Sequence, residues 1–149
     1  MMDNRKIAKE LNRIAKTLVS NNVANNDGLY KNFTGIIDWN ESTGKVSKAT
    51  FELSNEKGII WHDGIWHNGV WDKGWWQDGT WKKGTWYNGT WKDGTWKDGT
   101  WRDGIWKDGT WEKGNWKDGI WEYGTWEKGN WVKGEDKRGV EHLDSPDNW

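Results

Sequence analysis

The chain of 149 residues has no cysteine, a single proline and no apolar run close to the length of a membrane-spanning helix. The absence of cysteine excludes disulfide bonds and thiolate metal sites. Because a span needs about 20 consecutive apolar residues, we expect no transmembrane segment. The N-terminus also lacks the continuous apolar core of a secretory signal, which favours a cytoplasmic or virion-associated protein.

An excess of charge of either sign is also missing, since the chain has 22 basic and 23 acidic residues. The charges are unevenly placed: residues 1–20 carry a net charge of +3, residues 61–134 are neutral, and residues 135–149 carry −3. Affinity for nucleic acid grows with the number of phosphates that a protein neutralises. The neutral central region therefore argues against a nucleic-acid partner.

Tryptophan and glycine are abundant, with 18 and 20 residues. From Trp61 to Trp131 a tryptophan occupies every fifth position, and each is followed three residues later by glycine, up to Gly134. These fifteen Trp-x-x-Gly-x units alternate the largest side chain with the smallest, which indicates a packing repeat rather than a catalytic site. The tryptophans are Trp61, Trp66, Trp71, Trp76, Trp81, Trp86, Trp91, Trp96, Trp101, Trp106, Trp111, Trp116, Trp121, Trp126 and Trp131.

The repeat folds only if these tryptophans are buried. Burial of one indole removes about 150–250 Å² from water, worth roughly 4–6 kcal/mol. Ordering the five residues of a unit costs about 1.5 kcal/mol for each residue, which nearly cancels that gain. Exposed, the indoles would form an apolar patch far larger than the roughly few hundred Å² that soluble monomers tolerate. We therefore predict that all fifteen form a structural core.

The repeat predicts an all-β fold, a β-solenoid of fifteen five-residue units. A coil that advances in the same way at every unit places each tryptophan inside and leaves the outward positions to Lys, Asp, Glu and Thr. In a uniform meander of three-residue strands, the first and last residues of a strand would direct their backbone groups toward the same neighbouring strand. Tight turns at both ends of that strand would instead require these two residues to pair with the neighbouring strands on opposite sides. An alternating or closed β-hairpin array remains the alternative architecture.

The array resembles the pentapeptide-repeat proteins over residues 59–134. Units of that family have a large apolar centre and a small residue two positions earlier, as in the Gly-Thr-Trp sequences at residues 79–81 and 94–96. The resemblance implies a right-handed, four-sided β-solenoid. A local recurrence, in which residues 105–119 repeat as residues 120–134, indicates three units per coil as a second arrangement.

Residues 1–20 are predicted to form a basic amphipathic helix, because apolar residues recur at three- and four-residue spacing on one face. Three roles are open for this face. It packs on the protein's own β region, docks on a partner or a second copy, or, less favoured, lies on a membrane surface. The candidate partner-binding residues are Ile7, Leu11, Ile14 and Leu18.

The other flanking segments differ in character. Residues 21–28 are interpreted as a polar linker. Residues 29–60 are predicted to be β-rich and to cover the first layer of the array, with a period of two over residues 46–53. Residues 135–149 are polar and acidic, and we predict a flexible tail there.

The residues with reactive side chains do not form a recognisable site. Asp63, Asp78, Asp93, Asp98, Asp103, Asp108 and Asp118 all precede glycine, and we interpret them as turn formers rather than calcium ligands. His62 and His67 are five residues apart, so a coil places them on different faces. The sequence shows no catalytic triad, phosphate loop or paired carboxylates. We therefore predict no enzyme activity, no cofactor and no metal.

These features lead us to expect a non-catalytic structural or interaction protein. Its repeat would form a rigid tryptophan-cored scaffold, and its N-terminal helix would attach that scaffold to a partner. Its partner would be another protein or a second copy, within an assembly such as a virion. The alternative is a module that binds a glycan or a protein surface through outward Thr and Lys and through Trp75, which lies outside the fivefold phase.

We expect acrylamide to quench only a small share of the tryptophan fluorescence of the folded chain, because fifteen of the 18 indoles are predicted to be shielded from solvent. Stern–Volmer quenching of the native chain, compared with the chain in denaturant, measures that share. Quenching at the level of free indole would exclude the buried core.

Overall fold

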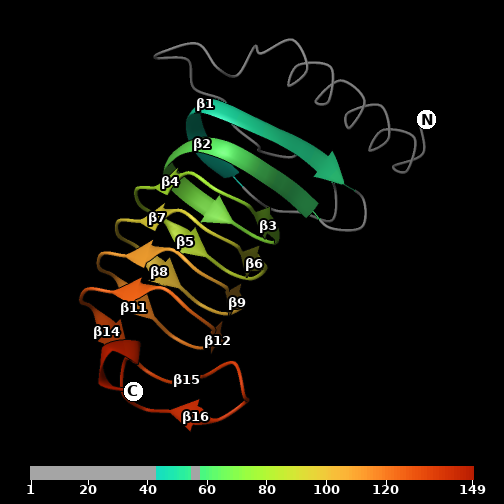
Figure 1. The fold of residues 1–149 in the computed structure, drawn as a ribbon. Coiled ribbons are helices and arrows are strands. Elements are labelled where there is room, and N and C mark those ends of the chain that lie inside the picture. Colours follow the sequence, from blue (N-terminus) through green and yellow to red (C-terminus); the bar gives the residue numbers. More distant parts are fainter. Residues whose placement is uncertain (1–42, 55–57) are drawn as a thin grey trace, which may run out of the picture.

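The structure is a computed structural model that describes residues 43–54 and 58–149 (Figure 1). Its central part is a β-solenoid of about five turns, whose short strands lie in parallel ladders. The solenoid predicted from the tryptophan repeat is therefore confirmed. The helix predicted for residues 1–20 and the linker predicted for residues 21–28 lie outside the described residues.

One turn of the solenoid contains three units, or 15 residues. Trp61 pairs in parallel register with Trp76, and Trp66 pairs in the same way with Trp81. The four-sided coil implied by the resemblance to pentapeptide-repeat proteins is therefore wrong, and the three-unit coil indicated by the local recurrence is correct. Parallel pairing throughout the array also excludes the hairpin alternative.

The size and shape of indole account for the three-sided coil. Neighbouring tryptophans within a turn meet edge to face, as Trp81 and Trp86 do with ring centroids 5.9 Å apart and ring planes at 72°. The ring quadrupoles favour this T-shaped geometry. Three indoles in this arrangement fill the centre of the coil, whereas a fourth side would leave a void on the axis, which close-packed interiors avoid.

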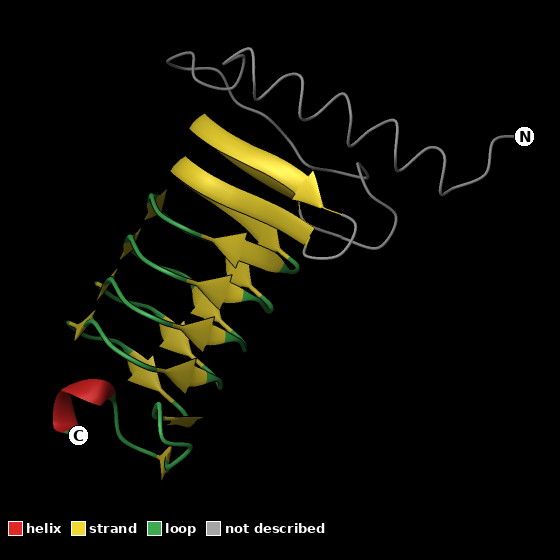
Figure 2. Ribbon diagram, turned by 45° about the vertical axis from the view of Figure 1, so that its right-hand side comes forward, coloured by secondary structure: helices red, strands yellow, loops and turns green. Residues whose placement is uncertain are grey.

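Each side of the solenoid is one ladder of short strands (Figure 2). Strand β2 (Gly58–Trp71) spans the first turn and begins all three ladders. The first ladder continues with β3 (Gly74–Trp76), β6 (Thr90–Trp91), β9 (Ile105–Trp106), β12 (Ile120–Trp121) and β15 (Gly134–Glu135). The second contains β4 (Thr80–Trp81), β7 (Thr95–Trp96), β10 (Thr110–Trp111) and β13 (Thr125–Trp126). The third contains β5 (Thr85–Trp86), β8 (Thr100–Trp101), β11 (Asn115–Trp116) and β14 (Asn130–Trp131).

Backbone hydrogen bonds on both sides of each tryptophan join consecutive turns. The residue after a tryptophan donates its N–H to the tryptophan carbonyl one turn earlier, as Lys92 does to Trp76 at 2.7 Å. The residue before a tryptophan donates to a glycine carbonyl of the previous turn, as Thr95 does to Gly79 at 2.9 Å. Because side chains alternate along a strand, the tryptophan points inward and its two neighbours point outward.

Glycine is required at the corners for two reasons, which Gly94 illustrates. Its φ of +118° is a conformation that side chains with a Cβ rarely adopt. A Cβ at this position would also clash with the backbone carbonyl oxygen of Gly79, one turn earlier. The glycine of the repeat therefore allows both the bend of the chain and the close approach of consecutive turns.

The residue before the glycine supports the corner. The Gly94 N–H donates to Asp93 Oδ1 at 2.8 Å, which satisfies a backbone donor that the ladder leaves unused. The prediction that these residues form turns is confirmed. The same bond is made by Asp63, Asn68, Asp78, Asn88, Asp98, Asp103, Asp108 and Asp118.

Three columns of stacked indoles run along the axis and form the core. The rings of Trp61 and Trp76 are 4.7 Å apart and nearly parallel, at 6°. The column spacing stays between 4.7 and 5.1 Å, close to the separation of about 4.8 Å between paired strands. The repeat tryptophans, at five-residue spacing from Trp61 to Trp116, are 0% exposed, and of the repeat tryptophans only Trp131, in the last unit, is half-buried. The predicted tryptophan core is confirmed.

Strand β1 (Thr43–Ser54) lies antiparallel to β2 along the edge of the first turn. Phe51 stacks on Trp61, with ring centroids 6.3 Å apart, and therefore covers the first indole of one column. Ser47 Oγ lies 2.7 Å from His67 Nε2, which joins the two strands on another side of the coil.

A β-bulge bends β1 around the first corner. Lys48 and Ala49 together oppose Gly64, and Lys48 has a φ of 52°. The bulge shifts the inward–outward alternation by one residue, so that Val46 joins Ala49 and Phe51 in the core. The strict period of two predicted for residues 46–53 would separate Val46 from those residues, and it is wrong at this bulge.

The chain after the last unit forms a C-terminal cap, here residues 134–149. Strand β15 pairs antiparallel with β16 (Glu141–His142), and the short 3-10 helix η2 (Pro146–Asn148) follows. Trp149 packs against Trp131 with ring centroids 5.5 Å apart. Composition predicts a flexible tail for residues 135–149. The structure instead has paired strands and ring contacts there, which a count of charged residues does not reveal.

Replacement of Gly94 by alanine is expected to destabilise the solenoid by about 3 kcal/mol or more, because a positive φ and a backbone clash act together. Gly139→Ala is the matched control, since Gly139 also has a positive φ but a Cβ there meets nothing within 4 Å. We expect the control to cost about 1 kcal/mol. Denaturant unfolding followed by near-UV circular dichroism measures both, and equal effects would contradict the role of close approach.

Candidate functional site

The outer surface of the array is organised in rows along the axis, because residues 15 positions apart occupy the same place in consecutive turns. On two sides the residues before the tryptophans are mainly threonine and asparagine, so these rows present hydroxyl and amide groups. Asn130 Nδ2 donates to Asn115 Oδ1 at 2.9 Å within one row. The rows are Ile65, Thr80, Thr95, Thr110 and Thr125, and Val70, Thr85, Thr100, Asn115 and Asn130.

The third side has a more apolar row. It consists of Ile60, Trp75, Thr90, Ile105 and Ile120, which pair in register from β2 to β12. Trp75 is 37% exposed and occupies an outward position of this row. Trp75 therefore lies on the surface and not in the core, as its position outside the fivefold phase of the sequence indicates.

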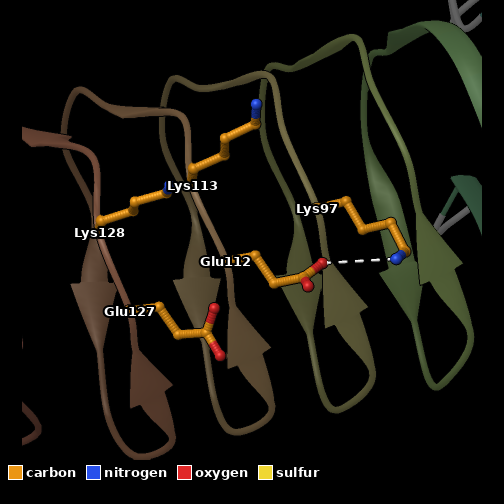
Figure 3. A pocket seen from close by; sticks show the side chains of 5 residues that line it. All are labelled: Lys97, Glu112, Lys113, Glu127 and Lys128. Carbon is orange, nitrogen blue, oxygen red and sulfur yellow. Dashed lines mark ion pairs between the residues drawn. The ribbon is translucent and has the colours of Figure 1, made fainter.

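Ion pairs connect consecutive turns on the outer surface. Lys97 Nζ lies 3.7 Å from Glu112 Oε2, and Lys113 Nζ lies 3.7 Å from Asp98 Oδ2. Lys97, Glu112 and Lys113 line a shallow depression together with Glu127 and Lys128, in which basic and acidic side chains lie side by side (Figure 3). Exposed pairs of this kind contribute about 0–1 kcal/mol each. The depression is therefore a surface where the array neutralises its own charge.

The C-terminal cap is organised by one carboxylate that the sequence analysis missed. Asp136 stands five residues after Trp131, where a sixteenth tryptophan would fall, and Gly139 keeps the glycine position of that unit. Asp136 is 8% exposed. Its Oδ1 accepts the backbone N–H groups of Arg138 and Val140, at 2.8 and 3.1 Å. The signal that identifies this residue is its place in the fivefold phase.

Side chains complete the environment of Asp136. His142 Nε2 lies 2.9 Å from Asp136 Oδ2, and the Arg138 guanidinium donates to the same oxygen at 3.0 Å. The hydrogen bond with His142, followed by those from the backbone and Arg138, holds the pKa of Asp136 far below its ordinary value. The carboxylate is therefore ionised at neutral pH and fixes the hairpin.

Aromatic contacts connect this carboxylate to the tryptophan core. The His142 ring stacks on Trp149 with centroids 3.9 Å apart. The Trp131 indole N–H donates to the His142 carbonyl at 3.0 Å, and the Trp149 indole N–H donates to the Asp144 carbonyl at 2.7 Å. The last indole of one column is therefore covered by the cap.

The remaining candidates from the sequence do not form a common site. Ile7, Leu11, Ile14 and Leu18 lie outside the described residues. His62 lies near Gln77 and Glu52, whereas His67 contacts Ser47, so the two histidines have separate partners. Burial and the charge of Lys82 lower the pKa of His67. In residues 43–54 and 58–149, no group of three or more His, Asp or Glu side chains is arranged to hold a metal ion, and no helix is long and apolar enough to span a bilayer.

Comparisons of the chain with protein-family models, curated proteins and solved structures find no match. What the chain shares with the pentapeptide-repeat proteins that its sequence resembles is the β-solenoid architecture. The fold alone defines the class, a β-solenoid with three Trp-x-x-Gly-x units per turn.

We expect Asp136→Asn to destabilise the protein at neutral pH and to reduce its acid sensitivity. The pKa of Asp136 is lower in the folded chain than in the unfolded one. Its carboxylate therefore stabilises the fold above roughly pH 4, and this contribution is lost as the pH falls toward the folded pKa. Denaturant unfolding at a series of pH values should show that the difference between parent and variant shrinks below about pH 4.

Leu143→Ala is the control for this experiment, because Leu143 belongs to the same segment and is 72% exposed. The control should follow the pH dependence of the parent. A constant difference between Asp136→Asn and the parent across the acid range would contradict the role assigned to the carboxylate.

Proposed function

We propose that the chain is a non-catalytic structural or interaction protein, a rigid tryptophan-cored β-scaffold in the cytoplasm or on a virion. The observation that supports the proposal best is the continuity of the stacked core. Ring contacts of 4.7 to 5.1 Å link each turn to the next, from Trp61 to Trp131. Each turn is also hydrogen-bonded to its neighbours at every unit. A rod packed in this way keeps its two ends at a fixed separation.

Residues 1–20 are assigned the attachment role. Their sequence combines the apolar residues Ile7, Leu11, Ile14 and Leu18 with a net charge of +3. The solenoid itself is neutral over residues 61–134 and pairs several of its charges between turns. The strongest combination of positive charge and apolar character therefore belongs to residues 1–20 and not to residues 61–134, which suits a segment that binds another protein.

A second candidate function is a module that binds a glycan or a protein surface. It is favoured by Trp75, whose exposed indole lies in register with Ile60 and Thr90. An exposed ring on a flat strand ladder offers a stacking platform, and the threonine and lysine side chains of the outer rows offer hydrogen bonds. In this function the rod surface is the binding site and residues 1–20 are dispensable.

Affinity capture from the native source separates the two functions. The full chain, the chain lacking residues 1–20, and the Trp75→Ala variant are used as baits. If the scaffold is attached through residues 1–20, their deletion should remove the captured partner, whereas Trp75→Ala should retain it. Near-UV circular dichroism confirms that each bait keeps its tryptophan core. Capture that survives the deletion and is lost in Trp75→Ala would overturn the scaffold proposal in favour of the surface-binding module.

A further inference from the structure

We propose that the C-terminal cap binds residues 1–20 of a neighbouring copy, so that molecules join head to tail. The inference rests on the scaffold function proposed above and identifies the partner of its attachment segment. The docking surface, here called the cap surface, consists of Val140, Leu143 and Trp149. These side chains are 47%, 72% and 41% exposed.

The exposed apolar side chains are concentrated at this end of the described chain. Three of the seven large hydrophobic residues that are exposed in the described ranges belong to the C-terminal cap, and a fourth, Val132, lies just before it. Trp149 stacks on His142, and Leu143 follows His142 directly. Val140 lies next to β16, the strand that ends at His142. The three side chains of the cap surface therefore belong to residues that flank β16 or contact it.

The charge around the cap surface is acidic, because the nearby basic side chains already have partners. Lys133 pairs with Asp118 at 3.7 Å. Lys137 donates to the Tyr123 hydroxyl at 3.0 Å, and Arg138 pairs with Asp136 at 3.0 Å.

Three acidic side chains of the cap have no charged partner in the described part of the chain, whereas the basic side chains named above are paired or hydrogen-bonded. Glu135, Glu141 and Asp144 are exposed and make no ion pair with any residue in the described part of the chain. The cap surface therefore combines exposed apolar groups with a rim of uncompensated negative charge.

Residues 1–20 have the complementary chemistry. They combine four apolar residues at helical spacing with five basic residues, for a net charge of +3 against the −3 of residues 135–149. An apolar stripe flanked by lysine and arginine would cover Leu143 and Trp149 and neutralise the acidic rim at the same time. No other stretch of the chain combines an apolar helical pattern with a positive charge of this size.

A neighbouring copy supplies this segment in the geometry that suits a rod. Strand β1 lies on the first turn and the C-terminal cap lies beyond the last, so they occupy opposite ends of the solenoid (Figure 2). A contact between opposite ends of two molecules is heterologous, because it uses a different surface on each partner. Such a contact repeats without closing and extends the scaffold along its axis.

Disulfide cross-linking between single-cysteine variants tests the proposal, since the natural chain has no cysteine. Ala15 is four residues after Leu11 and three before Leu18, so it shares the apolar face predicted for residues 1–20. Full-length Ala15→Cys is mixed with full-length Leu143→Cys under mild oxidation. We expect a covalent heterodimer. Ala15→Cys mixed with Lys92→Cys is the matched control, because Lys92 is also exposed but lies on the third turn of the rod. This control should cross-link about tenfold less.

Charge exchange gives a second measurement on the same pair of proteins. Glu141→Lys together with Asp144→Lys, in the Leu143→Cys chain, should reduce cross-linking by about tenfold. Arg13→Glu together with Lys16→Glu, in the Ala15→Cys chain, should restore it.

Three results would overturn the inference. The first is equal cross-linking at Leu143 and Lys92. The second is a disulfide that forms only within one molecule when Ala15→Cys and Leu143→Cys are placed in the same chain. The third is binding of the full-length chain to anionic vesicles without any cross-link between copies. In each case the scaffold proposal is judged separately, by whether deletion of residues 1–20 removes the captured partner.

Discussion

The distance between consecutive turns must suit backbone hydrogen bonds and ring stacking at the same time, and the rest of the structure depends on this match. Paired strands lie about 4.8 Å apart, and offset aromatic rings prefer centroid distances of about 4.5–7 Å. The columns have spacings of 4.7 to 5.1 Å, so both interactions are satisfied by one rise per turn. A register slip that is not a multiple of five residues would put a residue other than a repeat tryptophan into a column. The core therefore specifies the register of every strand.

Glycine makes this rise attainable. The corner glycines from Gly79 to Gly129 have a positive φ and face the carbonyl of the glycine one turn earlier, as Gly104 faces Gly89. A side chain at either position would force the turns apart and would separate the stacked rings as well as the strands. The largest and the smallest residues of the unit are therefore coupled, because the stacking of one depends on the close approach permitted by the other. The residues between them contact solvent, which explains why their identity varies from unit to unit.

The sequence predicts those parts of the structure that follow from the fivefold period. Burial of the tryptophans, their stacking in a solenoid and the turn role of the aspartates all follow from spacing and residue type. The number of units per turn depends on how three indoles fit around an axis, and the preferred prediction of four was wrong. The bulge at Lys48 depends on a positive φ in a residue other than glycine, for which there is no local signal. The functional candidates are less well determined, since Ile7, Leu11, Ile14 and Leu18 lie outside the described residues.

A stack of interchangeable units needs ends that differ from its interior, and the two ends of this solenoid are closed by different chemistry. At the first turn Phe51 covers Trp61, and β1 occupies the edge of β2 by antiparallel pairing. At the last turn the unit of residues 136–140 keeps its glycine but has Asp136 in place of tryptophan. A carboxylate cannot continue a column of rings, and when it is buried it must be hydrogen-bonded. It obtains these bonds from the backbone of Arg138 and Val140, which turns the chain back into β16. The length of the array is thus limited by a single departure from its own repeat, and the chain reversal at that point creates the exposed surface of the cap.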